Sequence, residues 1–191
     1  MKLIGIGGTD GSGKDTVADM LVKRHGWVFI SLSDLLRDEA KKRGIRLQRN
    51  TLRVISAEWR RKQGNDILVQ KALQKLGSDK SKVNGLVVAS LRNPVEADAV
   101  HSVSGKVAWV DADPKVRYVR IQLRQQGTED EVTFEEFLAE EKEHMTHQGD
   151  DATLSLSGVK ERADIFLENN GSDIEKFKDE AEKALASIIR A

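Results

Sequence analysis

The sequence has no cysteine, which excludes disulfide bonds and metal sites built from thiolates. Its apolar runs all fall well short of the roughly 20 residues that a membrane-spanning helix needs. Neither charge is in excess, because 31 basic residues balance 31 acidic residues, and this balance does not favour a nucleic-acid or membrane-surface partner. The first residues lead directly into an apolar strand without a signal peptide, so we expect a cytoplasmic protein whose 191 residues form one domain.

A glycine-rich stretch lies near the start of the chain, between a predicted strand and a predicted helix. Residues 3–6 form a short apolar run typical of a buried strand, and residues 17–24 have apolar residues at helical spacing. Gly13 and Lys14 stand where the helix opens. A strand, a glycine loop and a helix in this order predict a phosphate-binding loop. Its expected ATP-binding residues are Gly8, Thr9, Asp10, Gly11, Ser12, Gly13, Lys14, Asp15 and Thr16.

The residue types of this loop suit a phosphate ligand. Glycines let the backbone approach a phosphate closely, so that successive N–H groups and the helix dipole point at it. Lys14 supplies a mobile positive charge for the outer phosphates. Asp15 takes the position where such loops usually have the Ser or Thr that reaches Mg²⁺, and the hydroxyl follows one residue later at Thr16. A glycine-rich turn in an unrelated α/β protein is the alternative interpretation.

The Gly-Lys-x-Thr order of residues 13–16 resembles that of adenylate kinase and other nucleoside monophosphate kinases, and residues 9–14 look like the loop of thymidylate kinase. The resemblance implies ATP as the phosphoryl donor and Mg²⁺ as the cofactor. Along the chain, strand patterns alternate with helical patterns five times. We therefore expect an α/β, three-layer P-loop NTPase fold with a five-stranded parallel sheet. A small helical acceptor-binding insert at 32–77 and a short lid-like segment at 127–160 complete this expected architecture.

Residues 30–37 resemble the strand-to-helix junction at which adenylate kinases bind the acceptor nucleotide. The resemblance implies acceptor binding by Ser33, Asp34 and Arg37, with Arg37 on the acceptor phosphate. An arginine suits this role because its planar fork gives bidentate contacts to phosphate oxygens. A solvent-exposed helix charge is the alternative interpretation of Arg37.

Two further helices are predicted in the insert. We expect one over residues 52–62, capped by Asn50 and ended by Gly64, and one over residues 67–76, capped by Asn65 and ended by Gly77. The basic run at residues 60–62 is interpreted as a solvated face rather than as a phosphate- or RNA-binding patch.

A second group of candidate residues follows an apolar run at 85–90, which is typical of a buried parallel strand. Asn93, Pro94 and Glu96 have the order of a helix cap, a first helical residue and a capping-box partner. Arg92 is therefore expected at the carboxyl edge of the strand, where ligands of open α/β sheets bind. The resemblance to adenylate-kinase-like enzymes implies that Arg92 binds the acceptor and contacts the transferring phosphoryl group.

The stretch from Leu91 to Glu96 also resembles a family of poorly characterised P-loop kinase-like proteins from archaea and bacteria that are related to AMP and CMP kinases. This resemblance spans most of the chain. Members usually carry an aspartate near the end of this strand. In this chain the predicted strand ends with Ala89 and Ser90 instead. Either Asp15 or Asp111 then takes over the metal's water shell, or phosphoryl transfer is weakened, and the metal ligand stays undetermined.

Residues 106–111 predict the fourth strand, and an Asp-Pro pair then starts a helix that runs to about residue 125. Arg117, Arg120 and Arg124 share one face of this helix, and like charges at this spacing repel unless an anion answers them. The resemblance implies that Arg120 stacks on the adenine and that Arg124 reaches the phosphates. An exposed basic face, balanced by the acidic run that follows, is the alternative.

The lid-like segment is acidic and has no arginine between residues 125 and 160, whereas the lids of nucleotide kinases close over ATP with arginines. Within it, Thr133 and Glu136 predict a capping box for a helix over residues 134–144. His144 and His147 could share a helix face, and we interpret them as surface residues rather than metal ligands. The expected catalytic residues are Lys14, Arg92, Arg120 and Arg124.

The last part of the chain predicts a fifth strand at 163–168, a turn and a final helix. By the resemblance, the turn packs against the adenine and supplies Asn169 and Gly171 to the ATP site. Ser172 and Glu175 predict a capping box for the helix, whose apolar residues at 174, 177, 181, 184 and 188 form a stripe.

These features favour transfer of the terminal phosphoryl group of ATP to a small phosphorylated acceptor, most simply a nucleoside or deoxynucleoside monophosphate. The expected partners are small nucleotides rather than nucleic acid or membrane, and the protein is expected to be a monomer or homodimer. Two alternatives stay open. One is dephospho-coenzyme A kinase or another small-molecule P-loop kinase, and the other is an ATP-binding regulatory module with weak catalysis.

Overall fold

The computed structural model describes residues 2–77, 83–124, 132–145, 149–150 and 152–190. The strands are β1 (Lys2–Gly8), β2 (Val28–Ser31), β3 (Gly85–Leu91), β4 (Lys106–Asp111) and β5 (Ile165–Glu168). The helices are α1 (Lys14–His25), α2 (Leu32–Lys42), α3 (Arg49–Gln63), α4 (Ile67–Leu76), α5 (Pro94–Ser102), α6 (Pro114–Arg124), α7 (Phe134–Met145), α8 (Leu156–Glu161), α9 (Ile174–Ala184) and α10 (Ala186–Arg190).

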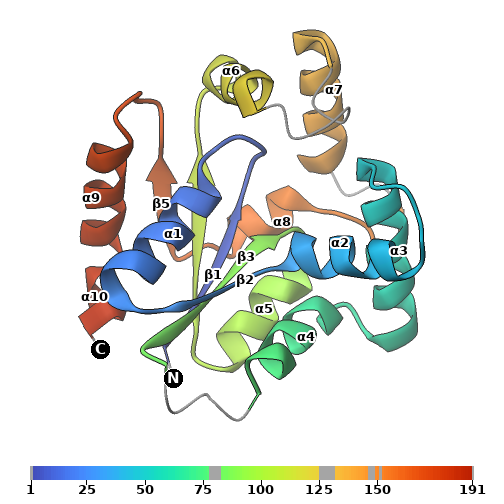
Figure 1. Ribbon diagram of the computed structural model, residues 1–191, viewed down its shortest axis with the longest axis horizontal. Coiled ribbons are helices and arrows are strands. Elements are labelled where there is room, and N and C mark those ends of the chain that lie inside the picture. Colours follow the sequence, from blue (N-terminus) through green and yellow to red (C-terminus); the bar gives the residue numbers. More distant parts are fainter. Residues whose placement is uncertain (1, 78–82, 125–131, 146–148, 151, 191) are drawn as a thin grey trace.

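The five strands form one sheet in the order β2-β3-β1-β4-β5, and every neighbouring pair is parallel (Figure 1). This confirms the predicted five-stranded parallel sheet. Because all strands run in the same direction, their carboxyl ends lie at one edge. The glycine loop after β1 and the turn after β3 meet there, and α6 lies above that edge in Figure 1.

Side chains of the central strands alternate between the two faces of the sheet, and each face has its own apolar core. On β3, Leu86 and Val88 belong to one core, and Val87 and Ala89 belong to the other. The first core packs against α2, α3, α4, α5 and α8, and the second packs against α1, α9 and α10. A parallel sheet covered on both faces needs strands that are apolar throughout, and this requirement explains the three-layer α/β architecture.

Several helix ends agree with their local sequence signals. Gly26 adopts a left-handed conformation after α1, with φ of 67°, as expected for a glycine that ends a helix. The capping box of Asn93 and Glu96 is present at the start of α5, with Pro94 as its first residue. Glu136 likewise accepts the backbone N–H of Thr133 at 2.8 Å before α7.

Three helices have a cap residue one or two positions away from the predicted one, although α4 covers residues 67–76 as expected. The observed cap residues are Gln48, Asp66 and Asp173, where the sequence favoured Asn50, Asn65 and Ser172. Neither Gln48 nor Asp66 makes a side-chain capping bond, so the packing of the apolar faces of α3 and α4 decides where these helices begin. Asp173 does cap α9, because its carboxylate accepts the Lys176 N–H at 3.0 Å.

In the last third of the chain, one helix was not predicted and one expectation was wrong. Helix α8 forms before the fifth strand, and Ser155 caps it by accepting the Gly158 N–H. Ile174 was expected in the apolar stripe of the last helix, but it is 60% exposed, because the buried face of α9 begins at Phe177.

The two ends of the chain lie side by side, at the edge of the sheet opposite the glycine loop (Figure 1). The Lys2 ammonium group donates a hydrogen bond to the Ile189 carbonyl at 2.6 Å. Among the described residues, the structure contains no helix whose length and apolar character would let it cross a membrane.

Candidate active site

The loop between β1 and α1 has a backbone conformation that requires glycine at several positions. Gly8, Gly11 and Gly13 all have positive φ, at 143°, 77° and 100°. A Cβ on Gly8 would overlap the Val110 carbonyl of β4, and a Cβ on Gly13 would lie 2.5 Å from the Asn169 amide nitrogen. Only glycine meets both the torsional and the spatial requirement at these two positions, as the sequence predicted for a phosphate-binding loop.

Lys14 begins α1 and is buried, with its ammonium group inside the curve of the loop. The Nζ atom donates to the carbonyls of Thr9 at 2.5 Å and Gly8 at 3.1 Å. Burial lowers the pKa of Lys14 to about 8, and the positive charge of Arg92 adds to this effect while Asp10 opposes it. A phosphate group in the loop would supply the anionic partner that the buried ammonium group lacks.

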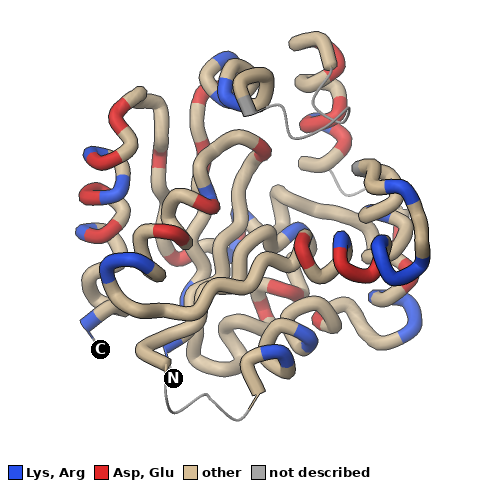
Figure 2. The backbone as a smooth tube through the Cα atoms, in the orientation of Figure 1, with Lys and Arg blue, Asp and Glu red and all other residues tan. Residues whose placement is uncertain are grey.

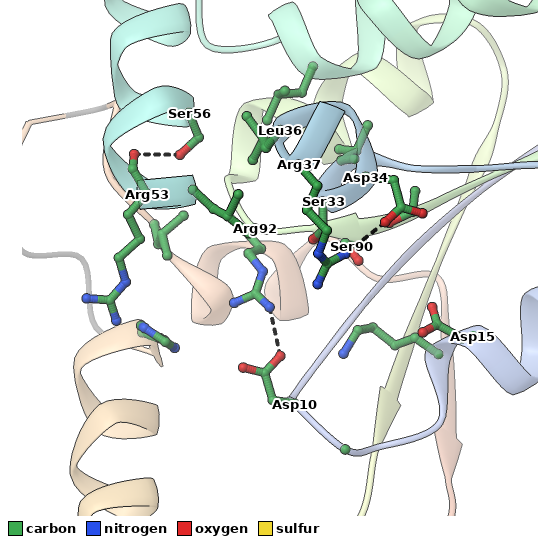
Figure 3. A pocket seen from close by; sticks show the side chains of 18 of the residues that line it. Asp10, Asp15, Ser33, Asp34, Leu36, Arg37, Arg53, Ser56, Ser90 and Arg92 are labelled. Atoms are coloured by element: carbon green, nitrogen blue, oxygen red, sulfur yellow. Dashed lines mark hydrogen bonds and ion pairs between the residues drawn. The ribbon is translucent and has the colours of Figure 1, made fainter. Parts of the chain in front are cut away.

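A cavity of about 420 Å³ opens beside the loop at the carboxyl edge of the sheet. One wall is the loop and the start of α1, and the opposite wall is formed by α2 and α3 (Figure 3). Its apolar lining residues are Phe29, Leu32, Leu36, Leu52, Leu68, Ile121 and Leu154. Its polar lining residues include Asp15, Thr16, Ser31, Ser33, Asp34, Arg37, Arg53, Ser56, Arg60, Ser90, Arg92, Arg120 and His144. The cavity thus joins the glycine loop to the helices that the sequence assigned to an acceptor.

The predicted acceptor residues Ser33, Asp34 and Arg37 all line this cavity from α2. Arg37 donates to Asp34 at 2.8 Å, and both side chains are partly exposed, at 37% and 59%. Arg92 extends from the end of β3 toward the loop and pairs with Asp10 at 2.7 Å, as Figure 3 shows. Both arginines are therefore held by carboxylates that a more strongly charged anion could replace.

The turn that carries Arg92 is fixed by a fully buried carboxylate. One oxygen of Glu96 accepts the backbone N–H groups of Arg92 at 2.7 Å and Asn93 at 3.1 Å. The other oxygen accepts the Arg60 guanidinium of α3 at 2.6 Å. Arg60 is itself only 3% exposed, so the expectation that residues 60–62 form a solvated face was wrong for its first member. No local sequence pattern indicates this pair, because its members lie 36 residues apart.

The segments predicted to bind the adenine base of ATP also meet beside the loop. Arg120 on α6 donates to the Gly171 carbonyl at 2.7 Å and to the Asn169 amide oxygen at 3.3 Å. Asn169 in turn donates to the Ser12 carbonyl at 2.8 Å. Burial lowers the pKa of the Arg120 guanidinium from its ordinary value. Arg124 ends α6, and its side chain lies outside the described part of the structure.

Arg117, the third arginine of the predicted face, is buried between α6 and α7. It pairs with both carboxylate oxygens of Glu141 on α7 and donates to the Ala112 carbonyl at 2.7 Å. In Figure 2, the basic α6 and the acidic α7 are neighbours in the upper part of the molecule. For Arg117, the acidic run therefore does balance the charge, as the alternative interpretation held, but in a buried contact rather than on an exposed face.

The two candidate metal carboxylates differ in their surroundings. Asp111 accepts the Thr9 hydroxyl at 2.7 Å and the Ala112 N–H at 2.9 Å, and it does not line the cavity. Asp15 is exposed and lines the cavity together with Thr16. Within the described ranges, no group of three His, Cys, Asp or Glu side chains is arranged to hold a metal ion.

His144 was expected at the surface, and this was wrong, because it is 7% exposed and lines the cavity from α7. The aromatic side chains of Phe134 and Phe137 on the same helix pack with Tyr118 of α6. His147 lies outside the described residues.

Known proteins share sequence with this chain over most of its length. A family model described as an AAA domain matches residues 4–144. A UPF0200 protein of Pyrobaculum aerophilum is 26% identical over 190 residues, covering 98% of this chain and 99% of that protein. The chain thus resembles an archaeal protein along nearly its whole length, as the sequence around Leu91 to Glu96 suggested.

Solved structures share the fold at low sequence identity. A Thermus thermophilus protein superposes with a TM-score of 0.60 at 24% identity, covering 97% of this chain and 96% of that one. Shikimate kinase from Bacteroides thetaiotaomicron superposes with a TM-score of 0.57 at 15% identity, covering 96% and 98%. The fold is therefore that of the P-loop kinases, and these likenesses establish the fold alone.

Proposed function

The chain belongs to the AAA domain family, and from that premise we propose that it is an ATP-dependent phosphotransferase acting on a small phosphorylated acceptor. A nucleoside or deoxynucleoside monophosphate is the acceptor that the residues favour most. One observation carries the proposal: a single cavity is lined by Lys14 of the glycine loop, by Arg37 of α2 and by Arg92, which follows β3. Donor and acceptor phosphates could therefore occupy one continuous space.

In this proposal the glycine loop holds the donor. Its backbone N–H groups and the start of α1 surround the phosphates, and Lys14 leaves the Thr9 and Gly8 carbonyls for the outer phosphate oxygens. Arg120 and the turn at Asn169 lie beside the loop and would form the edge of the base site. Such enzymes work mainly by positioning the reactants and stabilising charge, without a covalent protein intermediate.

The acceptor phosphate would take the place of two carboxylates. Arg37 is paired with Asp34 and Arg92 with Asp10, and both pairs line the same cavity. A phosphate dianion attracts a guanidinium more strongly than a carboxylate does and accepts its bonds bidentately. We expect both arginines to change partners when the acceptor binds, and Arg92 then lies between the acceptor and the transferring group.

Mg²⁺ fits the oxygen ligands on the loop side of the cavity. The ion usually keeps several waters and needs only one or two carboxylates besides the substrate phosphates. Asp15 and the Thr16 hydroxyl line the cavity, so these residues would hold the ion, and Asp111 is already occupied by Thr9 and Ala112. The ion would neutralise charge on the outer phosphates.

The proposal is tested by ADP release from purified protein with ATP and Mg²⁺. The acceptor panel holds ribo- and deoxynucleoside monophosphates, dephospho-coenzyme A and shikimate, the last because of the kinase neighbour of that name. Turnover that depends on one phosphorylated acceptor of the panel, and that falls on the order of 100-fold in Lys14→Ala, is the expected result. Tight ATP binding without turnover on any acceptor would contradict it.

That contrary result would favour a second candidate function, a nucleotide-binding module with weak catalysis. The observation behind it is Ser90, the residue before the last one of β3, which has a strained backbone conformation with φ of 71° and lines the cavity without a carboxylate. A Ser90→Asp variant tests whether the missing carboxylate causes that weak catalysis. A gain of turnover would mean that the missing carboxylate causes the weak phosphoryl transfer. An unchanged rate would mean that another feature of the site causes it.

A further inference from the structure

Arg53 is a cavity-lining arginine that none of the roles above uses. It lies in the second turn of α3, and it lines the cavity together with Ser56 and Arg60, which follow three and seven residues later on the same face of the helix. Arg60 is 3% exposed, whereas Arg53 is only partly buried. This face of α3 therefore presents one arginine that is enclosed by the protein and one that is not.

The guanidinium of Arg53 has no hydrogen-bond or ion-pair partner in the part of the chain that the structure describes. The backbone carbonyl of Arg53 accepts the Ser56 hydroxyl at 2.8 Å, and in Figure 3 the guanidinium stands apart from the labelled carboxylates. None of its nitrogens is among the buried atoms that lack a partner, so these nitrogens are open to solvent. A ligand in the cavity can therefore reach them.

The other arginines of the cavity are each held by the protein. Among the described lining residues, the pairs are Arg37 with Asp34, Arg92 with Asp10, Arg60 with Glu96, and Arg120 with the Gly171 carbonyl. Six lysines and arginines line the cavity against three aspartates, so positive charge is in excess there. Like charges on one concave surface repel each other and attract an anion. The unpaired guanidinium of Arg53 is the group that such an anion would neutralise.

We propose that Arg53 is an acceptor-binding residue whose guanidinium binds a phosphate oxygen of the acceptor. Helix α3 belongs to the wall that lies opposite the glycine loop, so Arg53 approaches from the acceptor side of the cavity (Figure 3). Arginine suits a phosphate because its planar fork can donate charge-assisted hydrogen bonds to two oxygens at once. The phosphate is either the one that Arg37 and Arg92 bind or a second one on the same molecule. This inference rests on the proposed function and adds a residue to its acceptor site.

Acceptor binding and protein stability should respond differently when this charge is removed. The side chain of Arg53 has no described partner, so Arg53→Gln breaks no hydrogen bond in the unliganded protein and relieves repulsion among the cations of the cavity. The midpoint of urea unfolding should therefore stay the same or rise slightly. A structural role of Arg53 would instead lower that midpoint.

The test is calorimetric binding of each member of the acceptor panel to the wild type, Arg53→Gln, Arg53→Lys and Arg61→Gln. We expect Arg53→Gln to weaken binding of the preferred acceptor about tenfold, because a charge-assisted hydrogen bond is lost. Lysine keeps the charge without the planar fork, so Arg53→Lys should recover part of the affinity. Arg61→Gln is the matched control, because Arg61 lies on the same helix, its side chain is 56% exposed, and it pairs with Asp150.

The panel also identifies which phosphate Arg53 binds. A tenfold loss for a nucleoside monophosphate, which has one phosphate, assigns Arg53 to the group that Arg37 and Arg92 bind. A loss confined to dephospho-coenzyme A, which has two linked phosphates, assigns Arg53 to a second phosphate. In either case the loss should shrink at high salt, and binding of a non-hydrolysable ATP analogue should not change.

The outcomes of this experiment are distinct from those of the turnover assay. Weaker acceptor binding in Arg53→Gln with no effect in Arg61→Gln supports the inference, even when no ADP is released and the proposed function fails. Unchanged acceptor binding in Arg53→Gln overturns it. An equal loss for the ATP analogue also overturns it, because Arg53 would then bind the donor. Failure of the wild type to bind any acceptor of the panel overturns it as well.

Discussion

At the scale of single residues, the site is built from charges whose partners a ligand would exchange. Lys14 rests on two loop carbonyls, Arg37 on Asp34 and Arg92 on Asp10. None of these partners has the charge of a phosphate. The arrangement keeps each cation ordered while its ligand is absent, and this order reduces the cost of arranging it when a ligand binds.

If the proposed function holds, the lowered pKa of Lys14 should make ATP binding depend on pH. With a pKa of about 8 rather than 10.5, Lys14 is largely neutral at pH 9, while bound phosphate favours its charged form and raises its pKa. ATP binding should therefore take up protons between pH 8 and 9 and weaken as pH rises through this window, whereas at pH 7 the lysine is already protonated. Asp10, Asp15, Arg92 and Arg117 are the charged groups that contribute to this pKa.

Calorimetry in buffers of different ionisation enthalpy measures that proton uptake directly. Lys14→Met should abolish the uptake while weakening binding at every pH. Uptake that persists in Lys14→Met would assign the titration to another group and contradict this account of the loop.

At the scale of elements, β1 and β4 approach so closely that they fix one position of the loop. Gly8 ends β1 directly against the Val110 backbone of β4, and its φ is 143°. Gly44 has a positive φ of 67° as well, but no atom lies within 4 Å of the place where its Cβ would be. Substitution at Gly44 therefore measures the cost of backbone torsion alone, whereas substitution at Gly8 adds the cost of contact between β1 and β4.

Gly8→Ala should be far more destabilising than Gly44→Ala. We expect Gly44→Ala to lower the free energy of unfolding by about 1 kcal/mol, the cost of a left-handed alanine. Gly8→Ala should cost at least about 3 kcal/mol or prevent folding, because β1 and β4 must move apart. Urea unfolding measures both values, and equal losses would mean that torsion alone requires glycine at Gly8.

Elements were predictable from the sequence where their signals are local. The capping box of Asn93 and Glu96 lies within four residues, and the strand at 85–90 is apolar throughout, so both were correct. The start of α3 and the cap residues of α3 and α4 were missed, because no side chain caps these helices and distant packing decides. The glycine loop and the arginines beside it were identified as candidates, whereas the burial of Arg60 was not, because it depends on Glu96 in another element.

At the scale of the whole molecule, Arg117 joins three parts of the structure. Its guanidinium pairs with Glu141 of α7, donates to the Ala112 carbonyl after β4, and lies 3.4 Å from the Asp10 carbonyl of the glycine loop. Asp10 also holds Arg92. The position of α7 is thus tied to the loop through one buried arginine.

Removal of Glu141 should loosen α7. Glu141→Ala leaves a 2%-exposed guanidinium whose other carboxylate neighbour, Asp111, lies 3.7 Å away, and we expect a loss of roughly 3 kcal/mol in unfolding free energy. Hydrogen exchange should speed up for the amides of α7 more than for those of α9. Glu143→Ala on the exposed side of the same helix is the control, and exchange that rises equally in both variants would exclude the buried pair as the anchor.

The contact between Lys2 and Ile189 has a practical consequence. β1 rises about 3.3 Å per residue, so its seven residues place both chain ends about 20 Å from the glycine loop. A tether or a fluorescent label on either end would therefore leave the cavity open to solvent. Two labels, one on each end, would sit close together in the folded state and report its loss from a place where no substrate binds.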